Sequence, residues 1–106
     1  MAKRKTVNYA TNSVFHDLGL KDADDLVLRA DLMHKIYEII AERGLTQVRA
    51  ASLMQMDQPR VSALLKGKIG KFSTDRLLRA LSDLGQNIEV RITPARAKKG
   101  RMHVAA

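Results

Sequence analysis

The sequence GLTQVRAASLMQMDQPRVSALLKG, residues 44–67, has the pattern of two short helices joined by a tight turn. Thr46 is placed to cap the first helix, because its hydroxyl can accept a hydrogen bond from a backbone N–H two or three residues later. Asp57 is placed to cap the second helix, and Pro59 falls in the first turn, where a missing N–H costs nothing. Gly67 is placed to end that helix in a left-handed conformation. Together these signals predict a helix-turn-helix.

The second predicted helix has one apolar and one polar face. Val61, Leu64 and Leu65 recur at helical spacing on the inner side, and Met56 can pack on Val61 as a hydrophobic staple. The outer side contains no acid and is rich in hydrogen-bond donors: Gln58, Arg60, Ser62 and Lys66, with Lys68 just beyond. A helix fits the major groove of DNA, where Gln can pair with adenine and Arg with guanine. The simpler alternative is a solvated helix face in an ordinary bundle.

Length and composition indicate one small domain. The chain has 106 residues, of which 45% are hydrophobic, but it has only two Phe and two Tyr. We therefore expect a single modest core of aliphatic residues. There is no cysteine, and no apolar run approaches the length of a membrane span or of a signal peptide's hydrophobic region. These features lead us to expect a cytoplasmic protein, associated with the nucleoid if it binds DNA.

The net charge of +8 is unevenly distributed. Residues 14–43 carry four bases and seven acids, whereas residues 44–79 carry seven bases and two acids. Residues 1–13 and 80–106 are also net positive. Because the positive charge is concentrated on the predicted helix-turn-helix and the two tails, it indicates a polyanionic partner such as double-stranded DNA.

The rest of the chain predicts a mainly helical fold with one strand. An apolar stripe predicts a long helix over residues 23–43: it includes Leu26, Ala30, Met33, Tyr37 and Ile40 and is widened by Leu32, Ile36 and Ile39. A short helical turn is expected around residues 14–20, and Ser73 or Thr74 should cap a further helix that ends near Leu84. The loop KGKIGKF, residues 66–72, is expected to be a flexible basic connector or a phosphate contact. We divide the chain into a basic flexible arm (1–11), a helix-turn-helix domain with a C-terminal strand (12–93) and a basic flexible tail (94–106).

The predicted strand is the alternating segment NIEVRITP, residues 87–94. Ile88, Val90 and Ile92 fall on one side, and Pro94 closes the segment. A single strand needs a partner for its backbone groups, and the chain offers only the weak segment from Val7 to Tyr9. We therefore hypothesise that Ile88, Val90 and Ile92 belong to a strand that pairs with its own copy in a homodimer.

The sequence contains no constellation of catalytic or cofactor-binding residues. His16, His34 and His103 lack the spacing of metal ligands, and the glycines match no nucleotide-binding fingerprint. Asp22, Asp24 and Asp25 lack the remainder of a calcium loop and are better explained as favourable charge at a helix start. We expect no enzyme, no metal and no cofactor.

The motifs RGLTQ, QPRVSALLKG, FSTDRLLRALSDLGQ and IEVRI, with NSVFHDLGL before them, carry a resemblance to a known family. Residues 44–67 resemble the Xre/Cro-type helix-turn-helix, and residues 12–93 resemble the HigA-type antitoxins of bacterial toxin–antitoxin operons. The resemblance implies a five-helix-like bundle with a helix-turn-helix of the lambda-repressor type. It also implies a dimeric operator-binding repressor that binds a small basic RNA-cleaving toxin. The turn position that the family usually fills with glycine is Gln55 here, at a cost of roughly 1 kcal/mol if its φ is positive.

Roles follow for individual residues as hypotheses. We expect Gln58 and Arg60 to contact base edges, and Ser62 and Lys66 to make phosphate or water-mediated contacts. Thr46 and Gln47, at the positive end of the first motif helix, are expected at a backbone phosphate, and Lys68 adds nonspecific charge. Two functional alternatives remain open: a stand-alone Xre-type regulator without a toxin, and a protein-interaction module that no longer binds DNA. Candidate toxin contacts are the two tails and the acidic residues of the long helix, Asp31, Glu38 and Glu42.

Overall fold

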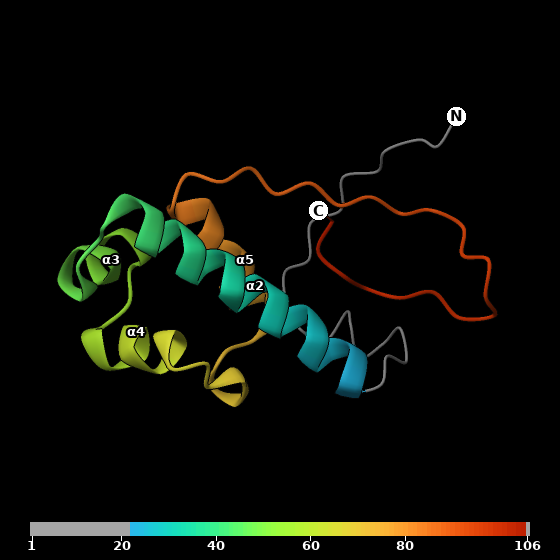
Figure 1. Ribbon diagram of the computed structural model, residues 1–106, viewed down its shortest axis with the longest axis horizontal. Coiled ribbons are helices and arrows are strands. Elements are labelled where there is room, and N and C mark those ends of the chain that lie inside the picture. Colours follow the sequence, from blue (N-terminus) through green and yellow to red (C-terminus); the bar gives the residue numbers. More distant parts are fainter. Residues whose placement is uncertain (1–21, 106) are drawn as a thin grey trace.

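The computed structural model describes residues 22–105. Four α-helices and one short 3-10 helix make up the regular structure of this part of the chain (Figure 1). In chain order they are α2 (Asp22–Arg43), α3 (Gln47–Met54), α4 (Gln58–Leu65), η1 (Ile69–Lys71) and α5 (Thr74–Asp83). The predicted mainly helical fold is thus confirmed, but the five-helix-like bundle is not, since the described residues form four α-helices. The short turn expected at residues 14–20 lies outside the described residues.

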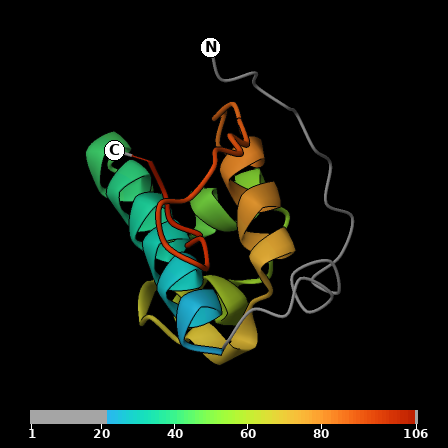
Figure 2. The same cartoon turned by 90° about the vertical axis from the view of Figure 1, so that its right-hand side faces the viewer.

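The long helix α2 is the support on which the other helices pack. Helix α5 lies alongside α2 (Figures 1 and 2). Helix α3 packs against α4 and α5, and both α4 and η1 contact α2. The centre of the core is filled by side chains from the four α-helices and by Phe72, which follows η1; they include Ile36, Met54, Val61 and Leu77. Burying this aliphatic cluster supplies the main favourable term in folding, since each large side chain contributes about 1.5–3 kcal/mol on burial.

The buried stripe of α2 agrees with the predicted one at Met33 and Ile40 and differs from it at two positions. Leu26 and Tyr37 were expected to face inward, but they are 42% and 51% exposed. The buried side of the helix is centred on Leu32, Ile36 and Ile39, which the predicted stripe includes. Successive residues of a helix are rotated by about 100°, so a stripe centred on these residues leaves Leu26 and Tyr37 beyond its edge.

Local signals located the helix ends well. The hydroxyls of Thr46 and Ser73 cap α3 and α5, and the carboxylate of Asp57 caps α4, each accepting from a backbone N–H three residues later. Gly67 follows α4 with φ at 75°, as the predicted left-handed end of that helix requires. The caps satisfy N–H groups that the helices themselves cannot pair.

The C-terminal part of the domain corrects two predictions. No strand is found anywhere between residues 22 and 105, and residues 86–95 run as irregular chain with Ile88 and Ile92 exposed. The strand prediction is therefore wrong for the single chain, since no strand lies there to pair with it. The loop at residues 66–72 contains the helical turn η1 and is not wholly irregular. The N-terminal arm, residues 1–11, and the weak Val7–Tyr9 strand lie outside the described residues. Within the described helices, none is long and apolar enough to cross a membrane.

Candidate nucleic-acid interface

The turn between α3 and α4 sets the orientation of the two helices. Gln55 adopts a left-handed conformation, with φ 56° and ψ 45°, at the C-terminus of α3. The backbone N–H of Met56 then donates to the carbonyl of Ala51 at 3.0 Å, so the chain leaves the helix in a tight reversal. Among the described residues, Gln55 is the one non-glycine residue with a positive φ.

Arg76 on α5 holds this turn in place through hydrogen bonds to its carbonyls. Nη2 of Arg76 donates to the carbonyl of Met54 at 2.7 Å and to that of Gln55 at 3.4 Å. These carbonyls lie at the negative end of the α3 dipole, where a cation is favourable. Arg76 therefore links α5 to the turn between α3 and α4. This link restricts the rotation of α4 relative to the core.

The side chains predicted to contact DNA lie on the outer surface of this motif. The residues that are exposed are Thr46, Gln47, Gln58, Arg60, Lys66 and Lys68, and Ser62 is half-buried. The hydroxyl of Thr46 already accepts from the N–H of Arg49, and the carboxylate of Asp57 accepts from the N–H of Arg60. The side-chain oxygens of Thr46 and Asp57 thus act as helix caps. The other predicted contact residues are available on the surface to bind a partner.

The predicted contact residues of α4 divide between two flanks of the helix. Val61 is fully buried, so the residues about 180° from it, Pro59 and Lys66, form the middle of the outer face. By the same helical rotation, Gln58 and Ser62 lie on one flank and Arg60 lies on the other. The guanidinium carbon of Arg60 lies over the ring of Phe72, 4.9 Å from its centroid. Arg60 therefore faces the loop that contains η1.

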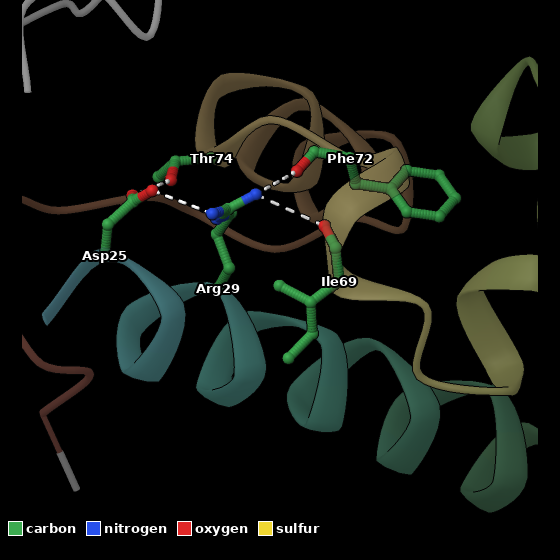
Figure 3. A network of polar contacts seen from close by, with 5 residues as sticks. All are labelled: Asp25, Arg29, Ile69, Phe72 and Thr74. Atoms are coloured by element: carbon green, nitrogen blue, oxygen red, sulfur yellow. Dashed lines mark hydrogen bonds and ion pairs between the residues drawn. The ribbon is translucent and has the colours of Figure 1, made fainter. Parts of the chain in front are cut away.

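A buried polar network joins that loop to α2 (Figure 3). Arg29 on α2 forms an ion pair with Asp25 at 2.9 Å, and both side chains are more than four-fifths buried. The same guanidinium donates to the carbonyls of Ile69 and Phe72 at 3.3 and 3.2 Å. Asp25 in turn accepts from the hydroxyl of Thr74 at the start of α5. The network fixes the η1 loop against α2, directly beside α4.

Sequence reasoning did not assign these two arginines a role. Each lies beside apolar positions of its own helix: Arg29 is three residues before Leu32, and Arg76 is four before Ala80. The sequence feature that could have identified them is a basic residue beside an apolar stripe, because a partly buried charge needs a partner. The partners are backbone carbonyls distant in sequence, which no local pattern identifies.

The described residues contain no group of three or more His, Cys, Asp or Glu side chains that could hold a metal ion. The exposed surface of residues 58–71 is instead basic: it contains Arg60, Lys66, Lys68 and Lys71. These residues include no acid, and the nearest one before them, Asp57, caps α4. Such a surface suits an anion with a regular backbone.

Comparisons with known proteins agree with this geometry. Residues 14–93 match the family described as "Helix-turn-helix domain". A solved structure assigned to the XRE family of transcriptional regulators superposes with a TM-score of 0.72 at 28% sequence identity, covering 81% of this chain and 97% of that one. No curated protein sequence matches the chain. The chain belongs to the helix-turn-helix domain family, and its fold is similar to that of a transcriptional regulator of the XRE type.

Proposed function

We propose that the protein is a sequence-specific repressor that inserts α4 into the major groove of double-stranded DNA. The observation that carries this proposal is the surface of α4, where Gln58, Arg60 and Lys66 are exposed on a helix whose opposite side is fixed in the core. Gln58 and Arg60 contact base edges, each giving about 1–3 kcal/mol of discrimination between bases.

The remaining polar residues of the motif position the protein on the DNA backbone. The N-terminus of α3 presents N–H groups that the helix does not pair, and Thr46 and Gln47 lie there to meet a phosphate. Ser62 and Lys66 contact phosphate oxygens directly or through water, and Lys68 adds charge at the end of α4. Contacts of this kind set the register of the protein and are independent of base sequence.

A homodimer would place two copies of α4 on a palindromic operator, about 34 Å apart. The segment with Ile88, Val90 and Ile92 is our candidate for the dimer contact, because Ile88 and Ile92 are 39% and 53% exposed on the single chain. Substituting Asp for both isoleucines should turn a dimer into a monomer in analytical ultracentrifugation. A wild-type chain that is monomeric at micromolar concentration would contradict this part of the proposal.

Selection from a pool of random-sequence duplexes, followed by salt titration of the best binder, tests the DNA proposal. Each phosphate contact lowers log K by about 0.9 per tenfold increase in salt, so Lys66→Ala should reduce that slope by about one. Arg79→Ala is the matched control: it removes one positive charge from α5, outside α3 and α4. Equal slopes for the two variants, or no selected sequence, would contradict the proposal.

We also propose that the regulator is the antitoxin of a HigBA-type pair, acting in the cytoplasm on the nucleoid. The outer side of α2 supports this: it exposes Leu26, Val27 and Tyr37, and it is bordered by Glu38 and Glu42. Apolar residues with an acidic border suit a small basic RNA-cleaving toxin. This side of α2 faces away from the core, so a toxin bound there would leave α4 accessible.

A pull-down from the host in high salt distinguishes the antitoxin from a stand-alone regulator. High salt weakens DNA contacts but not apolar ones. A stoichiometric small basic protein encoded beside this gene would support the antitoxin proposal, and Tyr37→Asp should abolish its recovery. Recovery of this chain alone would favour the regulator without a toxin, whose DNA surface is the same.

A further inference from the structure

We propose that Phe72 and Arg29 are positioning residues for the base contact of Arg60, an inference that rests on the proposed DNA-binding function. Arg60 is the only residue among the predicted base contacts that the described structure holds against an aromatic ring. Its guanidinium carbon lies 4.9 Å from the Phe72 centroid, within the range of about 6 Å over which a cation is attracted to a ring face.

A guanidinium over a ring face can keep its hydrogen-bond donors available for DNA. A guanidinium uses its face to stack, whereas its five N–H donors lie in its plane. The bidentate contact with guanine is made by donors of that plane. Stacking on Phe72 therefore restricts the rotation of the long Arg60 side chain before DNA arrives, and less conformational entropy is lost on binding.

Phe72 can serve as a fixed platform because Arg29 holds its backbone. The Arg29 guanidinium donates to the carbonyls of Ile69 and Phe72, and its ion pair with Asp25 orients it (Figure 3). Charged donors make hydrogen bonds about twice as strong as neutral ones. The contacts thus run from Asp25 on α2, through Arg29 and Phe72, to Arg60 on α4, and they place the Arg60 contact at the side of the groove nearest η1.

The test is the base preference of the full-length chain on a pool of random-sequence duplexes. Arg60→Ala should flatten the preference at one base pair of each half-site. Phe72→Leu, which keeps an apolar side chain in the core, should weaken the preference at that same base pair about 3-fold to 10-fold, the fold-change expected from losing a partly desolvated cation–π contact. Adding Phe72→Leu to Arg60→Ala should change nothing further at this position.

Leu77→Val is the control for a general loss of stability. Leu77 is fully buried on α5, so its truncation disturbs the core, but the preference at the Arg60 position should stay intact. If Phe72→Leu also left that preference intact, the positioning role would be wrong while the proposed function stood. If the wild-type chain selected no sequence, the proposed function itself would be wrong.

A second measurement observes the contact directly in the wild-type protein. In the free wild-type protein, the side-chain δ protons of Arg60 should be displaced upfield by the Phe72 ring in NMR spectra. The δ protons of Arg49, an exposed residue of α3, are the reference. Arg29→Met should move the Arg60 resonances toward those of Arg49. Identical shifts for Arg60 and Arg49 in the wild-type chain would overturn the inference.

Discussion

Replacing Arg76 by methionine should loosen the joint between α3 and α4. The variant keeps an unbranched chain of similar reach but loses the donors to the carbonyls of Met54 and Gln55. A hydrogen bond from a charged donor contributes about 1.5–3 kcal/mol, and the contact at 2.7 Å is the strong one of the pair. The Arg76 Nη1 atom is buried with no hydrogen-bond partner within the described part of the chain, and removing it offsets part of this loss.

We therefore expect Arg76→Met to lower the free energy of unfolding by about 1–2 kcal/mol, which corresponds to a fall in Tm of about 5–10 °C for a domain of this size. Urea and thermal unfolding followed by circular dichroism would measure both quantities. Arg79→Met is the matched control on the same helix: its ion pair with Asp75 spans 4.0 Å, and its side chain is 68% exposed. A surface pair of this kind contributes about 0–1 kcal/mol. Equal unfolding free energies for the two variants would refute the role assigned to Arg76.

Three further substitutions test individual contacts by urea unfolding. Gln55→Gly should stabilise the protein by about 0.5–1 kcal/mol, because φ at this residue is 56° and glycine relieves the left-handed strain; a loss of stability would contradict this. Ser73→Ala should cost about 1 kcal/mol, because the hydroxyl accepts from the N–H of Arg76 at 3.0 Å, and an unchanged midpoint would argue against the cap. Asp25→Asn should cost about 1–2 kcal/mol, because Arg29 would lose its buried counter-charge; a neutral effect would show that the two carbonyls alone compensate it.

The helix-turn-helix was predictable because its determinants are local. The caps at Thr46, Asp57 and Ser73, and the left-handed Gln55, each depend on residues within about one turn of the chain. Predicted contact residues such as Gln58 were found on the surface for the same reason: once the caps fix the start of α4, helical rotation fixes its faces.

Features that depend on packing between distant segments were not predictable in this way. Leu26 and Tyr37 satisfy an apolar repeat, yet their side of α2 is left uncovered by α3, α4 and α5. The segment around Val90 alternates as a strand should, but alternation cannot supply the neighbouring strand that its backbone requires. The partners of Arg29 are backbone carbonyls about forty residues away, a separation over which sequence pattern gives no information.

The contact between Arg60 and Phe72 also could not be predicted from local sequence. Phe72 is an apolar residue directly before the Ser73 cap of α5, and the structure buries it. That its ring also lies under Arg60 depends on the path of η1, which brings residue 72 back to α4. A residue of the core thereby contacts a residue of the surface that we propose binds DNA.

The most direct test of DNA binding through α4 is an NMR titration of the full-length chain with the duplex recovered by selection. Backbone amides of residues 46–48, 58, 60–66 and 68–71 should shift most strongly, and those around Tyr37 on the outer side of α2 should stay in place. Strong shifts confined to the outer side of α2 or to α5, with α4 unaffected, would contradict the account.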